Sequence, residues 1–238
     1  MNEIDCKNLS FDIINEKIRQ SKGDVKITGA LGERFIGAGL SDKKLLISGT
    51  PGNALGAYLN GATIEVNGNA QDAVGDTMND GKIIVHGSIG DAVGYAMRGG
   101  KIFVKGNAGY RAGIHMKEYK EKVPVLVIGG RAGSFLGEYQ AGGVIIVLGI
   151  NDEKIVGNFP SAGMHGGKLL LRSDCKNVDF PKNVHAKPVN KDELNEFYPF
   201  IKEFCDYFGY DEKEILNADF TLVTPDSNNP YKQMYVQN

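Results

Sequence analysis

The sequence is poor in cysteine, in excess charge and in long apolar runs. Its three cysteines, Cys6, Cys175 and Cys205, are far apart and form no CxxC pair, so we expect reduced thiols without a metal. The net charge of −2, with no long run of one sign, argues against nucleic acid or an anionic membrane as the main partner. No apolar run approaches the roughly 18 residues of a membrane span, and no signal segment opens the chain, so we expect a cytoplasmic protein.

Glycine, by contrast, is abundant, with 32 residues where average usage would give roughly 17. A repeat explains them, because the stretch DAVGDTMNDGKIIVHG from Asp72 returns 19 residues later, from Asp91, as DAVGYAMRGGKIFVKG. Glycines recur at this period and then skip 24 residues, five more than the period, before they resume. The series is Gly49, Gly68, Gly87, Gly106, Gly130 and Gly149. Repeats of this size predict a solenoid.

Three positions within each repeat remain apolar and would face a common core. The first contains Leu55, Val74, Val93, Ala112 and Leu136, and the second contains Leu59, Met78, Met97 and Met116. The third is a pair of β-branched residues two apart, which lie on one face of a strand. These pairs are Ile64 with Val66, Ile83 with Val85, Ile102 with Val104, and Ile145 with Val147. Stacked coils of this kind predict an all-β fold, a parallel β-helix with one strand per coil.

The coils need sharp corners, and five repeated glycines mark one of them. Glycine adopts positive φ without a Cβ clash, which suits a tight corner packed against neighbouring coils. The predicted corner glycines are Gly56, Gly75, Gly94, Gly113 and Gly137. Left-handed β-helices show a six-residue sub-period, which this sequence lacks. We therefore predict a right-handed β-helix of about seven coils over residues 25–172.

Both ends of the chain read as caps, which a solenoid needs to cover its open core. Residues 1–24 form the predicted N-terminal cap, with Ser10 at the N-cap of a helix over 11–20. Residues 173–238 form the predicted C-terminal cap, with helical spacing from Leu194 to Phe208 and a stop at Gly209. Pro199 predicts a kink or a new start near Tyr198. The tail from residue 217 is expected to lie extended along the body.

No residue of this chain is predicted to be catalytic, to bind a cofactor or to hold a metal. Its histidines are not spaced as metal ligands, and each glycine turn leads to another strand rather than to the helix of a dinucleotide site. Asp72 and Asp91 stack at one position that Asn53 also occupies, which favours a corner-capping ladder over an acidic active site. A stand-alone carbohydrate-active β-helix enzyme would need a row of carboxylates and basic residues on one outer face, and no such row is evident.

The repeats follow the pattern G-x-x-G, then G-x-x-x-x-G-G, then a β-branched strand. The stretches that carry it are GTPGNALGAYLNGATIEVNGNAQDAVGDTMNDGKIIVHG from Gly49, YRAGIHMKEYKEKVPVLVIGGRAG from Tyr110, and GMHGGKLLLR from Gly163. Over nearly the whole chain this resembles the GXGXG β-helix domain at the C-terminal end of the glutamate synthase large subunit. The resemblance is closest to the stand-alone version of that domain. The chain is also similar to the subunit of formylmethanofuran dehydrogenase that carries the same GXGXG domain.

The resemblance implies a non-catalytic scaffold subunit that binds no cofactor. In a glutamate synthase-type complex, separate glutamine amidotransferase and FMN-binding synthase chains would be its partners, in the transfer of the glutamine amide to 2-oxoglutarate during glutamate biosynthesis. The alternative is a component like the GXGXG-domain subunit of a formylmethanofuran dehydrogenase-type oxidoreductase. Self-association is a further option.

Two regions are predicted to contact such partners. One is the insertion near residues 114–124, where the period breaks, because insertions in solenoids often lie on the binding side. Its candidate contacts are His115, Lys117, Glu118 and Tyr119. The other is a stripe of outward, mostly apolar strand positions that includes Phe103, and that either a partner or the C-terminal helix of the same chain would cover.

Overall fold

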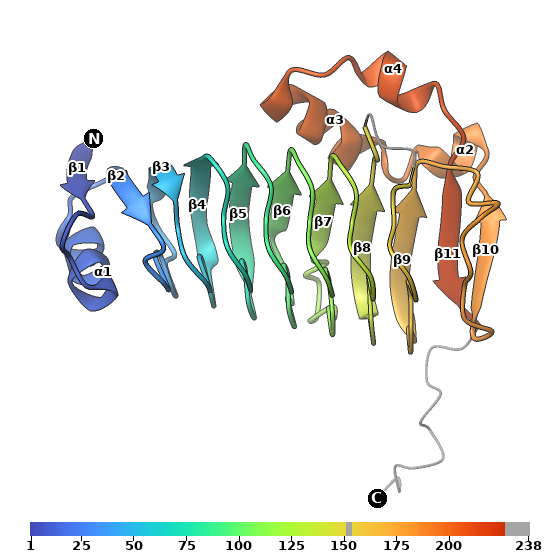
Figure 1. Ribbon diagram of the computed structural model, residues 1–238, viewed down its shortest axis with the longest axis horizontal. Coiled ribbons are helices and arrows are strands. Elements are labelled where there is room, and N and C mark those ends of the chain that lie inside the picture. The colour runs from blue at the N-terminus through green and yellow to red at the C-terminus, as the bar shows by residue number, and fades with distance from the viewer. Residues whose placement is uncertain (151–153, 227–238) are drawn as a thin grey trace, which may run out of the picture.

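A computed structural model describes residues 1–150 and 154–226, and these residues form one elongated solenoid (Figure 1). Within this part of the chain, 11 strands make one sheet in the order β1 to β9, then β11, then β10. The strands are β1 (Asn2–Asp5), β2 (Val25–Leu31), β3 (Lys44–Thr50), β4 (Asn60–Asn67), β5 (Asp80–Val85), β6 (Lys101–Val104), β7 (Val125–Ile128), β8 (Ala141–Val147), β9 (Gly166–Leu171), β10 (Val184–Pro188) and β11 (Thr221–Pro225). The helices are α1 (Phe11–Gln20), α2 (Lys191–Leu194), α3 (Tyr198–Phe208) and α4 (Glu212–Leu216).

The strands from β1 to β9 pair in parallel, one beside the next, which confirms the predicted parallel β-helix with short helical caps. One strand per coil from β2 to β9 gives eight coils, one more than predicted. The pairing carries the core residues in register, from Ile64 to Ile83 to Ile102 and, across the insertion, to Leu126. The predicted apolar positions are all buried, including every member of the Leu59 to Met116 series.

The helical caps lie close to where the sequence predicted them. Helix α1 buries Ile14 and Ile18 against the first coils. Ser10 stands at its N-cap position, but its side chain makes no capping hydrogen bond. The predicted C-terminal helix is divided, because α2 ends at Leu194 and α3 starts anew at Tyr198 with Pro199 in its first turn. Gly209 ends α3 with a φ of 72°.

Three strands in the cap regions, β1, β10 and β11, were not predicted. β1 extends the sheet at the N-terminal end, and β11 lies in the segment that was expected to be an extended tail. β11 pairs antiparallel with β9 and with β10, so the chain returns to cover the last strand of the solenoid. An uncovered strand edge favours pairing with other chains, and this return closes it. The rest of the predicted tail, 227–238, lies outside the described residues.

Helix α3 crosses the outer face of the sheet and covers the outward apolar stripe (Figure 1). Its buried side chains pack on the stripe, and the ring of Tyr207 lies 5.3 Å from the ring of Phe103, centre to centre. Both Lys82 and Lys101 reach Glu203 of α3 at 2.6 Å. Burial opposes ionisation of Glu203, but the hydrogen bonds from Lys101 and Lys82 outweigh it and lower the pKa of the carboxyl group.

The corner glycines all have positive φ, between 63° and 70°, as predicted. The reason for glycine is different, however, because Ala54 and Tyr58 on either side of Gly56 also have positive φ. Their N–H groups donate to carbonyl oxygens of the next coil, at 2.9 Å and 2.8 Å, which holds this conformation in place. Positive φ therefore occurs at every second residue of the corner, and it does not by itself require glycine in the middle.

The room available for a Cβ atom limits which residue fits the middle position of the corner. A Cβ on Gly56 would lie only 2.7 Å from Cδ1 of Ile83, which belongs to the next coil. Most of the corners repeat this crowding. In the last coil of the solenoid no further coil follows, and there the equivalent position is Ser161, which is fully buried. At Gly56, close stacking of coil on coil, rather than φ alone, selects glycine.

Two alanine substitutions separate crowding from backbone conformation. Gly56 and Gly94 have nearly the same φ, 63° and 67°, but the nearest atom to a Cβ on Gly94 is Sδ of Met97 at 3.7 Å. Gly94→Ala should lose about 1–2 kcal/mol through its left-handed backbone. Gly56→Ala should lose about 1–3 kcal/mol more, because Ile83 must move in a packed core. Urea unfolding of both variants measures the difference, and equal losses would show that crowding does not select glycine.

Candidate interaction surface

Polar side chains at the corners, which could otherwise serve in catalysis, form hydrogen bonds between neighbouring coils. Oδ1 of Asn53, Asp72 and Asp91 accepts a hydrogen bond from the backbone N–H of the next coil, at 3.3, 2.9 and 2.8 Å. Asn69, Ser88 and Asn107 form a second ladder of the same kind. The carboxylates of Asp72 and Asp91 therefore belong to a corner-capping ladder, as the sequence predicted.

The histidines lie apart from one another. Nε2 of His86 is 3.0 Å from Oε1 of Glu65, and Nε2 of His185 is 2.8 Å from Oδ1 of Asp226. Nδ1 of His165 lies 3.0 Å from the carbonyl oxygen of Gly163. In residues 1–150 and 154–226, no three His, Cys, Asp or Glu side chains are placed to hold a metal ion. The same part of the chain has no helix long and apolar enough to cross a membrane.

The three cysteines are buried, and each has a free thiol. Burial raises the pKa of the Cys6 thiol and of the Cys205 thiol to about 11, and it also raises the pKa of Cys175. A thiol is a nucleophile only as the thiolate, so all three side chains are unreactive near neutral pH.

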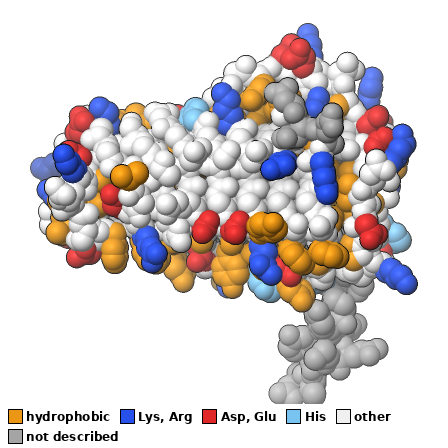
Figure 2. Space-filling view, in the orientation of Figure 1, with side chains coloured by type: hydrophobic (Ala, Val, Ile, Leu, Met, Phe, Trp, Pro, Cys, Tyr) orange, Lys and Arg blue, Asp and Glu red, His pale blue; other side chains and the backbone are white. Residues whose placement is uncertain are grey.

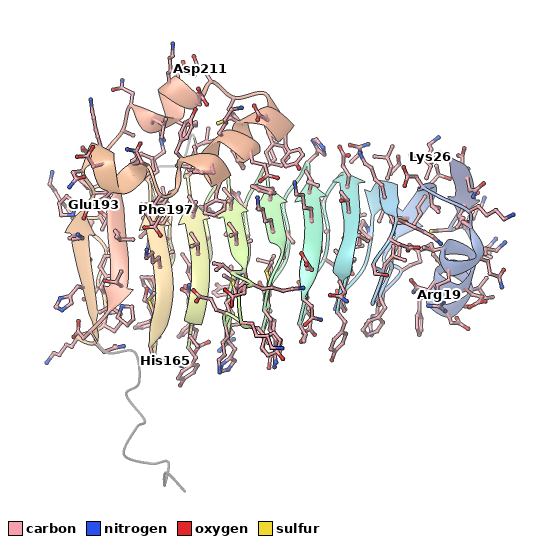
Figure 3. The ribbon with its side chains drawn as sticks, turned by 180° about the vertical axis from the view of Figure 1, so that it is seen from behind. Arg19, Lys26, His165, Glu193, Phe197 and Asp211 are labelled. Carbon is pink, nitrogen blue, oxygen red and sulfur yellow. The ribbon has the colours of Figure 1, made fainter. Side chains whose placement is uncertain are left out.

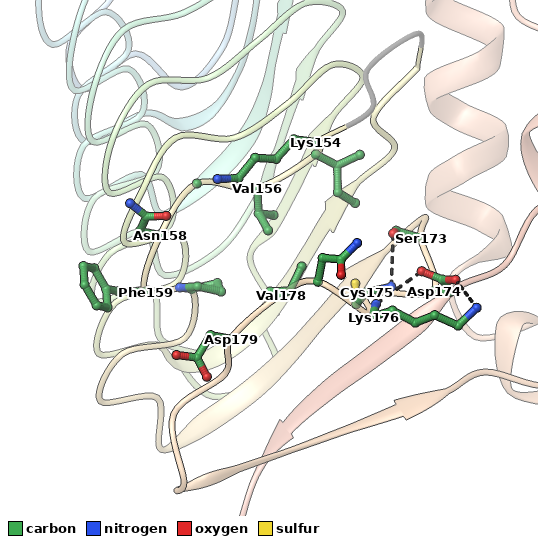
Figure 4. Close-up of a pocket in the computed structure, with 14 residues that line it drawn as sticks. Lys154, Val156, Asn158, Phe159, Ser173, Asp174, Cys175, Lys176, Val178 and Asp179 are labelled. Carbon is green, nitrogen blue, oxygen red and sulfur yellow. Dashed lines mark hydrogen bonds and ion pairs between the residues drawn. The ribbon is translucent and has the colours of Figure 1, made fainter.

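A hollow of 630 Å³ lies between the last coil and the segment that follows β9 (Figure 4). Asn158 and Phe159 line one side, and Asp174, Cys175 and Lys176 line the other. The ammonium group of Lys176 forms an ion pair with Asp174 at 2.7 Å, and burial raises the pKa of the Cys175 thiol. The described residues that line the hollow therefore include no activated nucleophile with a neighbouring base, which covalent catalysis would need.

The insertion near residues 114–124 is a short loop held against the solenoid. Nζ of Lys122 lies 2.8 Å from Oδ2 of Asp80, and Oε1 of Glu118 accepts a hydrogen bond from the N–H of Gly143 at 2.9 Å. The side chains of His115, Lys117, Glu118 and Tyr119 are exposed, and their contact with a partner stays a prediction.

The prediction that Phe103 contacts a partner is wrong. Its side chain is 0% exposed, because α3 of the same chain covers it. The stripe belongs to a second core between the sheet and the C-terminal helices, and no part of Phe103 is accessible to another protein. Of the two interpretations of the stripe, the structure supports the cover by the chain's own helix.

Exposed aromatic rings gather instead along the corner that the five glycines mark (Figures 2 and 3). We call this row of side chains the aromatic edge, and every member lies within two residues of the middle of a corner. Its exposed members are Phe35, Tyr58, Tyr95, His115, Tyr139 and Phe159, and the half-buried Phe135 also belongs to it. Tyr58 is 58% exposed and Phe159 is 62% exposed. Figure 2 shows hydrophobic side chains gathered on the lower side of the solenoid, where the edge lies.

Neighbouring coils bring the rings of the aromatic edge together. The rings of His115 and Tyr139 stack at 5.3 Å with an interplanar angle of 9°, and Tyr95 meets the other side of His115 at 6.0 Å. Phe135 and Phe159 also stack at 5.3 Å. Because the ring faces contact each other, mainly the ring edges are presented to solvent. The sequence signal was an aromatic residue close to a corner glycine, which the periodic core pattern does not include.

Three comparisons place the chain among known proteins. Residues 7–226 match the family described as GXGXG motif. The uncharacterized protein MJ1350 of Methanocaldococcus jannaschii is 43% identical over 248 residues, which span 98% of this chain and 95% of that protein. A chain in the crystal structure of the formyltransferase/hydrolase complex (FhcABCD) from Methylorubrum extorquens, in complex with methylofuran, shares the fold with a TM-score of 0.63 and 18% identity. That match covers 92% of this chain and 89% of the other. The fold, the repeated glycine corners and the match over nearly all of the sequence agree, and the chain belongs to the GXGXG motif family.

Proposed function

We propose that this chain is a non-catalytic scaffold subunit that holds the other components of an enzyme complex through its aromatic edge. The edge carries the proposal because exposed apolar rows of this length mark interfaces. Tyrosine and other aromatic side chains are enriched in protein interfaces and dominate their binding energy. The described thiols and histidines supply no assembled catalytic group, so the chemistry would belong to the partner chains.

Two kinds of complex are candidates for the partner. The shared fold with a chain of the formyltransferase/hydrolase complex supports a complex of the formylmethanofuran type, in which this chain takes the place of the GXGXG-domain subunit. The glycine-repeat stretches, which resemble the stand-alone domain of glutamate synthase, support a complex with glutamine amidotransferase and FMN-binding synthase chains. The fold comparison favours the formylmethanofuran type of the two.

A chromosomally tagged chain, purified from its native cells, tests this proposal. We expect other chains to co-elute in fixed stoichiometry, and their identities to select one of the two complexes. In a variant with Tyr95→Ser, Tyr139→Ser and Phe159→Ser, the amount of co-purified partner should fall at least about tenfold. The reason is that aromatic hot spots of interfaces each contribute on the order of 2 kcal/mol or more. The matched control replaces two exposed apolar residues away from the edge, Leu31→Ser and Ile13→Ser.

The two outcomes of this test differ plainly. Loss of the partner in the edge variant, with retention in the control, supports the aromatic edge as the binding surface. A wild-type chain that elutes alone from native cells would overturn the proposed scaffold role.

A further inference from the structure

Three carboxylates, from Asp72, Asp76 and Asp91, lie at the corners in the middle of the aromatic edge. One oxygen of each is occupied: Asp72 and Asp91 cap the next coil, and Oδ1 of Asp76 accepts a hydrogen bond from the Thr77 hydroxyl at 2.8 Å. The second oxygen of each accepts no hydrogen bond from the described residues. Among those residues, no lysine, arginine or histidine forms an ion pair with any of the three.

The repeat itself shows how a cation binds at this edge. Nε of Arg111 lies 2.9 Å from Oε2 of Glu138, in the next coil, and its guanidinium lies 5.1 Å from the ring centre of Phe135. Glu138 follows the middle of its corner by one residue, and Asp76 does the same in its own coil. The place of Arg111 in the coil before Asp76 is taken by Ala54. Asp76 therefore occupies the same place in its coil as Glu138, but the coil before it has no arginine to pair with this carboxylate.

The surroundings of Asp76 leave room for a cation from outside. The neighbouring corner positions carry small side chains, namely Ala54, Ala73, Thr77 and Ala92. Tyr58 and Tyr95 stand exposed in the coils on either side of Asp76, and these two coils are about 10 Å apart. A guanidinium between them would meet ring surface and carboxylate oxygens together, and both attract it.

We propose that an arginine side chain of a partner protein binds between Tyr58 and Tyr95, with Asp76 as its ion-pair partner and Asp72 and Asp91 close by. This inference rests on the proposed scaffold function, and it specifies the chemistry of the partner segment. Arginine is the cation of this site because its planar group pairs with a carboxylate and stacks on a ring at once, as Arg111 does inside the chain. The partner segment otherwise presents apolar side chains to the rings on either side.

A triple substitution to asparagine removes the charge and keeps the shape. Asn53 and Asn107 already cap the next coil through Oδ1, so Asp72→Asn, Asp76→Asn and Asp91→Asn should leave the thermal melt nearly unchanged. The control variant, Asp42→Asn, Asp179→Asn and Asp192→Asn, makes the same change of charge at sites elsewhere on the chain. Each tagged variant is isolated from native cells, and the co-purified chains are then eluted with increasing NaCl.

We expect the variant with Asp72→Asn, Asp76→Asn and Asp91→Asn, the site variant, to bind its partner at least about tenfold more weakly at low salt. Its binding should also depend less on the NaCl concentration than that of the wild type, because salt screens the ion pairs that only the wild type forms. The control variant should match the wild type. Equal retention and equal salt dependence in the site variant would overturn the arginine site while the scaffold function stands. If the wild-type chain brings down no partner at all, the scaffold function itself fails. If the only chain recovered is a second copy of this one, the assignment to a different protein is wrong.

Discussion

Met97→Asp should abolish cooperative folding or lower the stability by several kcal/mol. Met97 is fully buried in the stacked series that runs from Leu59 to Met116. A carboxylate at this place would have no cation and no water, and an unpaired buried charge costs several kcal/mol. That is a large part of the roughly 5–15 kcal/mol that stabilises a typical domain. Thermal melts followed by circular dichroism, together with urea unfolding, measure the effect.

Two controls make this result specific to burial. Arg98→Asp places the same side chain on the adjacent, exposed position and should change the stability by less than about 0.5 kcal/mol. Met97→Leu keeps the core apolar and should cost less than about 1.5 kcal/mol. If Met97→Asp melted within a degree or two of the wild type, the assignment of this series to the core would be wrong.

Phe103→Lys should lower the stability by roughly 2–4 kcal/mol, from the lost aromatic packing and the buried charge. The ring lies under α3, against Tyr207, and is wholly inaccessible to solvent. The introduced ammonium group would also lie near Lys82 and Lys101, which already share one carboxylate, Glu203. A thermal melt and a sizing column on the purified variant measure stability and assembly separately.

Phe159→Lys is the matched control, since it makes the same substitution on a ring that is 62% exposed. It should leave the melt within about 0.5 kcal/mol of the wild type, as surface substitutions usually do. A variant of Phe103 that kept full stability but changed its assembly would mean that the stripe contacts another chain and that α3 leaves it in solution.

The repeat made much of the fold predictable. A period of 19 residues places Ile64, Ile83 and Ile102 on one face, and parallel pairing of each coil with the next keeps them in register. Each coil contacts mainly its neighbours, so one repeat read correctly predicts the rest. The capping role of Asp72 and Asp91 followed from the same stacking. The insertion could also be located, because it breaks the period.

The predictions from sequence were wrong or incomplete at positions whose residue type the 19-residue period does not explain. The spacing of Gly56 suggested that φ selects glycine, but Ala54 and Tyr58 share that φ, and only the approach of Ile83 from the next coil explains the missing Cβ. The aromatic edge was not predicted because its members occupy three different places around the corners, namely two residues before the middle, one residue after it or two residues after it. Whether such a residue points outward depends on the corner conformation, which the spacing alone does not define.

The sequence by itself determined the parallel β-helix, its core positions and its family, since all of these rest on contacts between equivalent residues one period apart. The tertiary structure decided what covers each surface. The contact between Phe103 and Tyr207 joins residues that no period relates, and it depends on the path of the chain after β9. The same return of the chain brought β11 beside β9 and closed the sheet edge. Both follow from long-range packing of apolar faces, which is set by the whole three-dimensional arrangement rather than by local spacing.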